Sequence, residues 1–392
     1  MRLGLGGMAI FPHLLFAVSC AHAAPLLPAG PPSVLISQAE REALGLRIGP
    51  DSIVDLMNDR SRTYLVFSGS INLPGGVEHG DTFRLAVDPT LSRISGPLQV
   101  IMRPACQVGR AAPPAGCGKF DSDYAGAGSI VTCPQGTIYM YHGENHTPPG
   151  GQYQQGVQGW TGIGQAHWDP SRGMLVKDGQ VAGLNASNAW RSGPAGPETA
   201  QTNAASGNPS VVRDRSNVND YLYFGDRSDA PDATGRGMRC ERRTCWAVAR
   251  ADHAALCAGA ANGHPANWQI WHNGAFAAPA LLPDGTGSAF TPMLNQDDGV
   301  DNLANVTKLP GQDGYVMVSI LRPGDAIVER TSSDGLHWSR PATLVASPTP
   351  PLQNTYPRIL PLPARPGAFV LTYVVMGKPA WQHMELMRQE LK

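Results

Sequence analysis

Four carboxylates in this chain stand where short apolar strands meet polar turns, a setting in which a side chain can exchange protons with a ligand. Glu144 follows the apolar and aromatic run from Ile138 to Tyr141 and stands between His142 and His146. Two carboxyl groups held a short distance apart can divide into a general acid and a base or nucleophile. We expect that chemistry from a set of four candidate catalytic residues, with Glu144 as the first candidate for the acid: Asp51, Glu144, Asp226 and Asp301.

Ring-bearing and cationic side chains near these carboxylates are candidate ligand contacts. Imidazole and phenol rings pack against the faces of sugars, and a guanidinium group holds a carboxylate. The candidates are His142, His146, Arg213, Tyr356 and Arg358. Purely structural alternatives stay open, in which Glu144 pairs with Arg213 or Arg358 to join neighbouring sheets, or Asp226 caps its own loop. For Asp301 the expected roles are to orient an acid or to line the channel, and a purely structural role stays open as well.

The strands that must position these residues recur in five modules, separated by Gly, Pro, Asn and Asp turns. The modules cover approximately residues 49–105, 121–186, 207–285, 300–347 and 354–390. Such radial repetition predicts an all-β fold, a five-bladed β-propeller of four-stranded antiparallel blades over residues 49–392. A two-sheet sandwich or two successive β domains are the alternatives, because alternating strands alone do not fix closure.

The propeller geometry decides which candidates share a face. If the first strand of each blade starts near the axis at one face, the second strand ends at that same face. Asp51, Tyr356 and Arg358 lie at first strands, whereas His142 and Glu144 follow a second strand. We therefore expect acidic, aromatic and basic side chains to converge on one rim, forming a polar cup that suits an oligosaccharide.

One hairpin carries a sequence motif, and its second strand is expected to begin at Trp338. The segment from Ile327 to Pro341 contains Ser332, Asp334, Gly335 and Trp338, a Ser-x-Asp-Gly-x-x-Trp pattern. It resembles the aspartate box of sialidase-like propeller proteins, with one residue fewer between Asp and Gly. The resemblance implies that the aspartate caps the turn between the two outer strands of a blade, and that the tryptophan packs between blades, away from the ligand face.

The module plan as a whole resembles the five-bladed glycoside hydrolases that include arabinanases, xylosidases and fructosidases, over most of residues 49–390. In that group an aspartate at the start of the first inner strand serves as base or nucleophile, and Asp51 occupies this place without the usual aromatic-Asn-Asp-Pro signature. The resemblance implies hydrolysis of a neutral glycan, since a sialidase needs three arginines where only Arg358 and Arg213 are candidates. A non-catalytic cell-surface or periplasmic propeller that binds glycan or protein is the alternative.

The N-terminus predicts export. Residues 1–23 combine Arg2, an apolar run and Ala21-His22-Ala23, as in a secretory signal peptide. A lipoprotein acylated at Cys20 is the less favoured reading. Residues 24–48 are expected to form an arm with a short helix, opened by a capping box at Ser37 and Glu40.

Cysteines, charge and composition set further bounds. Six cysteines remain in the exported chain, and an oxidising compartment favours the pairs Cys106 with Cys117, Cys240 with Cys245 and Cys133 with Cys257 among several possible connectivities. A zinc site is disfavoured because no C-x-x-C occurs.

A net charge of -1 gives no nucleic-acid footprint. We expect a monomer without a membrane span or cofactor, although the acidic run from Asp297 to Asp301 has spacing that would suit calcium.

Overall fold

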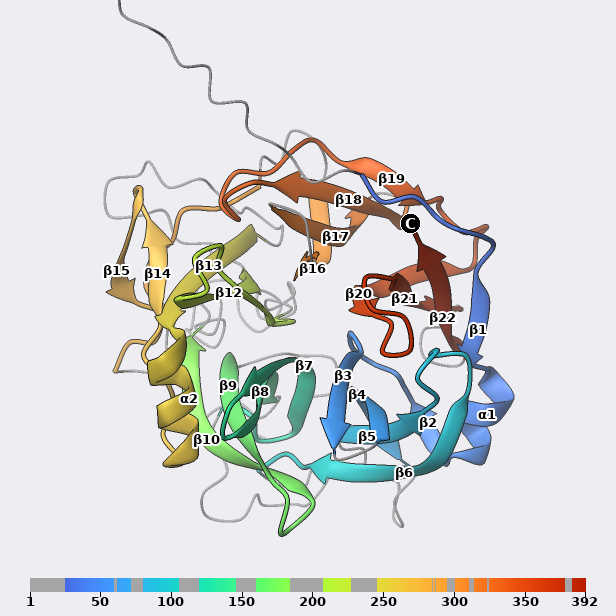
Figure 1. Ribbon diagram of the computed structural model, residues 1–392, viewed down its shortest axis with the longest axis horizontal. Helices are drawn as coiled ribbons and strands as arrows, with labels where there is room; N and C mark the ends of the chain where they lie inside the picture. The colour runs from blue at the N-terminus through green and yellow to red at the C-terminus, as the bar shows by residue number, and fades with distance from the viewer. Residues whose placement is uncertain are drawn as a thin grey trace, which may run out of the picture.

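The described strands form five antiparallel sheets arranged as the blades of a ring, accompanied by two helices in the described part of the chain (Figure 1). The computed structural model describes residues 25–59, 62–71, 80–105, 120–145, 160–183, 207–226, 245–283, 285, 287–294, 300–309, 314–322, 324–377 and 383–392, without the side chains of residues 127, 160, 226 and 300–302. The all-β, five-bladed propeller expected from the sequence is confirmed. Neither helix in these residues is long and apolar enough to cross a membrane.

Each blade is built from strands that follow one another along the chain, except that blade 5 has a further strand from the N-terminal segment. Blade 1 contains β2 (Leu46–Ile48), β3 (Asp55–Asp59), β4 (Arg62–Ile71), β5 (Asp81–Val87) and β6 (Ile94–Met102). Blade 2 contains β7 (Tyr124–Cys133), β8 (Gly136–Asn145), β9 (Trp160–Asp169) and β10 (Met174–Gly183). Blade 3 contains β11 (Ser210–Arg213), β12 (Asn219–Asp226), β13 (Cys245–Asp252), β14 (Gln269–His272) and β15 (Ala275–Pro279). Blade 4 contains β16 (Val300–Lys308), β17 (Tyr315–Arg322), β18 (Ala326–Ser332) and β19 (Ala342–Val345). Blade 5 contains β20 (Gln353–Pro361), β21 (Phe369–Met376) and β22 (Met384–Leu391).

The blades bury both of their faces, which explains why many strands read as continuous apolar runs. Six consecutive residues at the start of β17, for example, are all buried. Five apolar clusters of described residues fill the five spaces between neighbouring blades, one for each pair around the ring. A two-sheet sandwich would instead leave one face of each sheet in water, so that alternative is wrong.

The ring closes through the N-terminal segment. Strand β1 (Ser33–Ile36) pairs with β22 and completes blade 5 at its outer edge (Figure 1). Before β1, Leu27 exchanges two backbone hydrogen bonds with Lys392, at 3.1 and 3.0 Å, and the Leu26 amide donates to Glu329 of blade 4 at 3.1 Å. The expected arm is therefore part of the ring itself, with both ends of the described part of the chain at blade 5. The expected short helix is present as α1 (Gln38–Ala43), and the Ser37–Glu40 capping box is confirmed.

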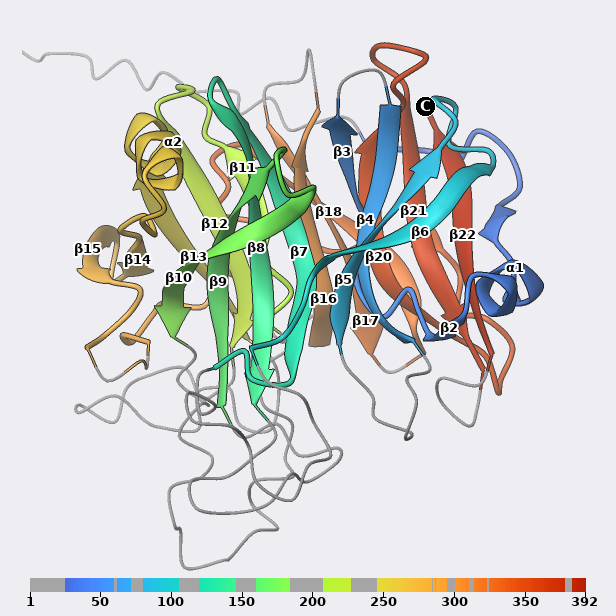
Figure 2. The same ribbon diagram turned by 90° about the horizontal axis from the view of Figure 1, so that it is seen from below.

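The innermost strands define the two faces of the ring. Strands β3, β7, β11, β16 and β20 surround the axis, each contacting the innermost strands of the adjacent blades. We call the face where these strands begin the start face and the opposite one the end face. In Figure 2, helix α2 (His253–Ala261) lies at the face toward which β3 points, which is the end face.

Two local features differ from the sequence expectation. Helix α2, inserted between β13 and β14, was not expected. In blade 4 the outer strand β19 begins at Ala342 rather than near Trp338. The turn before β19 is held by Asp334, whose Oδ1 accepts from the amides of Leu336 and His337 at 2.8 and 2.9 Å, while Trp338 makes an edge contact with Tyr223 of blade 3.

Candidate functional site

Asp51 is held at the start face between β2 and β3. Its amide donates to the Ser68 carbonyl oxygen at 2.8 Å, which fixes the backbone beside β4. Its own carbonyl oxygen accepts from Ser68 Oγ at 2.9 Å and from the Tyr124 hydroxyl at 3.1 Å. The Oδ1 atom of its carboxyl group accepts from the Tyr356 hydroxyl at 2.8 Å. Blades 1, 2 and 5 therefore converge on this one residue.

Tyr356 reaches Asp51 from an irregular position in β20. The pairing of β20 with β21 shifts register between Thr355 and Arg358, and Tyr356 has a φ of 52°. A bulky residue in the left-handed region is a genuine outlier, and such bulges commonly re-aim a side chain next to a functional site. The bulge therefore has a plain structural role here, which is to turn the Tyr356 phenol toward Asp51.

Glu144 belongs to the same group of side chains. It pairs with Tyr124 across β7 and β8, and its Oε1 lies 3.7 Å from His142 Nδ1. The His142 ring makes an edge contact with the Tyr124 ring at 5.9 Å between centroids. Glycine is required at position 207 because a Cβ atom there would lie 2.7 Å from His142 Cδ2. Three of the expected residues, Asp51, Tyr356 and Glu144, are thus linked through Tyr124 and His142.

The electrostatics of this group favour a protonated Asp51. Although Asp51 keeps some contact with solvent, the loss of water around its carboxyl group raises its pKa to about 8; the Tyr356 hydrogen bond opposes this rise and the nearby negative charge of Glu144 adds to it. Burial, reinforced by Asp51 and Glu144, raises the pKa of the Tyr124 and Tyr356 phenols well above their ordinary value. Both phenols therefore remain hydrogen-bond donors at any physiological pH.

A further buried carboxylate, Asp81, was not among the expected catalytic residues. It begins β5, directly after Gly80, which bridges to Tyr124. Neither carboxylate oxygen has a hydrogen-bond partner among the described residues. Burial raises the pKa of Asp81 to about 6, against the opposing positive charges of Arg103 and Lys177. Asp81 stands where the loop after β4 leads into β5, and this position was the available sequence signal.

The structure places Arg358 at the axis of the ring. Its Nη2 donates to Asp55 Oδ2 at 3.0 Å, and its Nη1 donates to Ser210 Oγ and Asn305 Oδ1 at 3.0 and 3.1 Å. Ser129 Oγ lies 3.3 Å from Asp55 Oδ2. We call Asp55, Ser129, Ser210, Asn305 and Arg358 the axial network, because each blade contributes one of these five polar residues from its innermost strand.

Bulges in the innermost strands explain how these side chains reach the axis. Register shifts interrupt β7, β16 and β20, and in each strand the first paired residue after the shift belongs to the axial network: Ser129, Asn305 and Arg358. A bulge bends its strand and redirects the next side chain. The network lies further along the strands than Asp51 and Tyr356, so it forms the floor beneath them.

Arg213 lies at the other end of its blade. It ends β11 and donates through Nε to Asp220 Oδ1 at 2.9 Å, beside the turn into β12 and next to α2. Arg213 therefore lies at the end face, whereas Asp51 and Tyr356 lie at the start face, so the structure does not bring Arg213 together with them. The alternative in which Glu144 pairs with Arg213 or Arg358 fails, since both guanidinium groups bind elsewhere.

Several expected residues cannot be placed. Outside the described residues lie His146, Cys106, Cys117, Cys240 and, from the acidic run, Asp297 and Asp298, as do the side chains of Asp226 and Asp301. The structure joins Cys133 to Cys257, as expected. Cys245 is also disulfide-bonded, whereas its expected partner Cys240 lies outside the described part of the chain.

Comparison with known proteins gives similarity in fold only. No family model matches the sequence, and no curated protein matches it. Among solved structures, a family 117 glycoside hydrolase from the marine bacterium Zobellia galactanivorans is similar with a TM-score of 0.51 and 11% identity, covering 93% of this chain and 91% of that one. A GH62 α-L-arabinofuranosidase from Coprinopsis cinerea has a TM-score of 0.49 and 10% identity, covering 94% and 98%. An endo-arabinase from Bacteroides thetaiotaomicron has a TM-score of 0.47 and 11% identity, covering 92% and 98%.

The fold is that of the five-bladed glycoside hydrolases. The identities are too low to carry more than this architecture. Any assignment of chemistry must therefore come from the residues at the start face.

Proposed function

We propose that this protein is an exported glycoside hydrolase that cleaves a neutral glycan at the start face, with Asp51 and Glu144 as its paired carboxylates. The observation that carries the proposal is the meeting of these two residues around the Tyr124 and Tyr356 phenols, three blades contributing to one group. The similarity in fold to a family 117 glycoside hydrolase agrees with it.

The two carboxylates differ in a way that suits division of labour. Asp51, whose pKa of about 8 keeps it protonated at neutral pH, suits the general acid that protonates a leaving glycosidic oxygen. Glu144, whose Oε1 lies 3.7 Å from His142 Nδ1, is left as the base or nucleophile. This assignment reverses the sequence-based expectation, in which Glu144 was the acid.

The proposal of a neutral substrate rests on where the two arginines that were expected to contact a ligand lie. An acidic sugar needs guanidinium groups beside the reacting carbon. Arg358 is bound to Asp55 in the axial network and Arg213 faces the opposite end of blade 3. Phenols such as Tyr124 and Tyr356 instead suit hydroxyl-rich, uncharged sugar faces.

Export is part of the same proposal. The disulfide between Cys133 and Cys257 is typical of an oxidising compartment, which agrees with the signal-peptide-like residues 1–23. Cell fractionation of the native host would test it, and a cytoplasmic, unprocessed protein would contradict it.

Incubating the purified protein with aryl glycosides of arabinose, xylose and galactose, and with neutral polysaccharides, tests the hydrolase directly. Asp51→Asn and Glu144→Gln should each lower kcat by roughly 100-fold or more on the best substrate. The matched control Glu42→Gln changes an exposed carboxylate on α1 and should leave kcat unchanged. Binding of the same glycans without turnover, equal in the wild type and in Glu144→Gln, would favour the non-catalytic glycan-binding alternative.

A further inference from the structure

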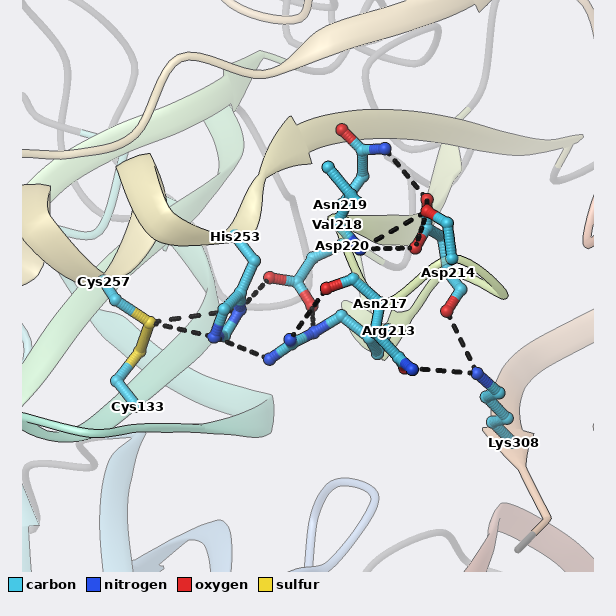
Figure 3. Close-up of polar contacts among 11 residues, drawn as sticks. Cys133, Arg213, Asp214, Asn217, Val218, Asn219, Asp220, His253, Cys257 and Lys308 are labelled. Carbon is cyan, nitrogen blue, oxygen red and sulfur yellow. Dashed lines mark hydrogen bonds and ion pairs between the residues drawn. A yellow bond between two sulfur atoms is a disulfide. The ribbon is translucent and has the colours of Figure 1, made fainter. Parts of the chain in front are cut away.

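A second polar cluster lies near the end face, between blades 2 and 3, around the Cys133–Cys257 disulfide (Figure 3). Cys133 ends β7, and Cys257 lies in α2. Asp51 precedes β3 and so belongs to the other face of the ring. The cluster is therefore separate from the candidate hydrolase site, and the proposed hydrolysis does not involve its residues.

His253 connects this disulfide to two charged residues. Its Nδ1 lies 2.7 Å from Asp220 Oδ2, and its Nε2 lies 2.6 Å from Arg213 Nη2. Since arginine can only donate, Nε2 accepts from Arg213 and Nδ1 carries the proton donated to Asp220. Asp220, whose side chain is 2% exposed, binds Arg213 Nε through its other oxygen. The guanidinium charge is thus held firmly against the imidazole.

The two sulfur atoms are not equivalent in this setting. Cys257 lies one helical turn after His253, and its Sγ is 3.3 Å from His253 Nε2 and 3.9 Å from Nδ1. Figure 3 shows Cys133 on the far side of the sulfur pair from the imidazole. Since Nε2 has no proton to donate to the sulfur, a thiolate on Cys257 would be stabilised by the positive charge of Arg213, which is bound to Nε2; such a charge lowers a thiol pKa and improves the leaving group.

We propose that Cys133–Cys257 is a thiol–disulfide exchange centre in which Cys257 is the leaving sulfur and a dithiol is the reaction partner. A thiolate of the dithiol attacks Cys133 Sγ, forming a mixed disulfide, while the electron pair of the Cys133–Cys257 bond leaves on Cys257. The second thiolate of the dithiol then displaces Cys133. Two electrons pass from the dithiol, which becomes a disulfide, to the two cysteines, and its two protons pass to them or to solvent.

The position of Cys133 suits the attack. It is 8% exposed and opens the turn into β8, where Pro134 and Gln135 are exposed, whereas Cys257 is 4% exposed. The more accessible sulfur is therefore the one to be attacked, and the sulfur beside the positive charge is the one to leave.

Asp220 opposes the charge of Arg213, but its second oxygen binds His253 Nδ1, which lies 3.9 Å from Cys257 Sγ, whereas Arg213 binds Nε2, which lies 3.3 Å from it. The remaining charged groups are engaged elsewhere. Lys308 donates to the Asp214 carbonyl oxygen at 3.0 Å, on the far side of Arg213. Asp252 is engaged as the N-cap of α2, accepting from the Ala255 amide. A metal ion is disfavoured at Cys133, His253 and Cys257, although their ligand atoms lie within 4.8 Å of one another, because Arg213 occupies Nε2 with a positive charge.

The test uses the full-length oxidised protein, dithiothreitol as the dithiol, and alkylation read by mass spectrometry. Cys133–Cys257 should be reduced roughly tenfold faster than the disulfide that contains Cys245, which serves as an internal reference. In the reduced protein, alkylation of Cys257 should reach half its maximal rate well below the ordinary thiol pKa of about 8.5, and alkylation of Cys133 near it.

Variants separate the role of the charge from mere accessibility. Arg213→Gln and His253→Gln should slow the reduction and raise the alkylation midpoint of Cys257, whereas Lys308→Gln, which removes a charge that does not touch the sulfur, should change neither. Equal midpoints for Cys133 and Cys257 in the unaltered protein would overturn the proposal even if every variant failed to fold. So would reduction no faster than that of the Cys245 disulfide.

Discussion

The Tyr356 hydroxyl donates a 2.8 Å hydrogen bond to Asp51 Oδ1, and the bond crosses the seam at which the first blade meets the last. Tyr356 lies in β20 of blade 5, whereas Asp51 leads into β3 of blade 1. Asp51, the candidate acid, therefore has its Tyr356 hydrogen bond only when the ring is closed, so the geometry of the site depends on the whole fold.

Removing this hydrogen bond should change the titration of Asp51. The Tyr356 hydroxyl favours the ionised carboxylate, so Tyr356→Phe should raise the pKa of Asp51 further above about 8, by roughly one unit. The alkaline limb of the pH dependence of glycan hydrolysis or binding should move upward by the same amount. Tyr373→Phe is the matched control in the same blade, because Tyr373 lies in a buried apolar cluster. An unmoved or lowered limb in Tyr356→Phe would refute the assignment.

The raised pKa of Asp51 also predicts a pH-dependent cost to folding. Below about pH 4 this carboxyl group is protonated in both the folded and the unfolded chain, so it contributes no difference. Between there and about pH 8 the unfolded chain ionises while the folded one keeps its proton, so stability falls as pH rises.

Asp51→Asn removes this effect. The variant should match the wild type at pH 4 and become more stable at pH 8 by on the order of 1–2 kcal/mol, a figure reduced for the partial exposure of Asp51. Thermal unfolding across this pH range measures it, with Glu42→Gln as the control. A stability difference that stayed constant with pH would contradict the raised pKa.

The axial network predicts strong coupling between two buried charges. Arg358→Met leaves the Asp55 carboxylate buried without its cation, and should lower the free energy of unfolding by about 3–5 kcal/mol. The double variant with Asp55→Asn should lose less than the sum of the single variants. Arg322→Met removes a half-exposed arginine paired with Asp325 and should cost no more than about 1 kcal/mol. Additive losses in urea unfolding would argue against coupling.

Strand β7 of blade 2 approaches β4 of blade 1 so closely that Gly126 should not tolerate a side chain. A Cβ atom on Gly126 would lie 2.2 Å from the Cβ atom of Ser68, the residue that fixes the Asp51 backbone. Gly126→Ala should therefore cost about 1–3 kcal/mol and displace Ser68, which also impairs the site. Gly30→Ala, where nothing lies within 4 Å of the added atom, is the control, and similar behaviour of the two variants would disprove the steric argument.

The architecture could be predicted from the sequence because many blade strands are recognisable as short apolar runs. The first six residues of β17, for example, are all buried and Ser319 is the one polar residue among them, as expected for a sheet with two buried faces. The sequence did not reveal the closing strand, because Ser33–Ile36 is short and lies far from its partner β22 in the chain. Helix α2 was missed because it is apolar on all sides and lacks an amphipathic period; the Asp252 N-cap was the available sign.

The site was harder to predict than the fold. Asp51 and Tyr356 were chosen because they lie at the start of a blade's first strand, and Glu144 because it follows a second strand. By the same criterion Arg358, two positions after Tyr356, was equally suitable. A bulge decides between them, since the shift between Thr355 and Arg358 turns one side chain to Asp51 and the other to the axis. Polar residues such as Ser129 and Asn305 inside apolar strands were visible, but only the ring shows that they meet.

Closure through β1 has a consequence for how the molecule is made. The first described strand to leave the ribosome, Ser33–Ile36, has no partner until Leu386 to Arg388 have been synthesised. This strand must therefore remain unpaired with β22 while the first four blades are synthesised. A nascent chain stalled before its last strand would therefore be an open ring, with apolar edges available to chaperones.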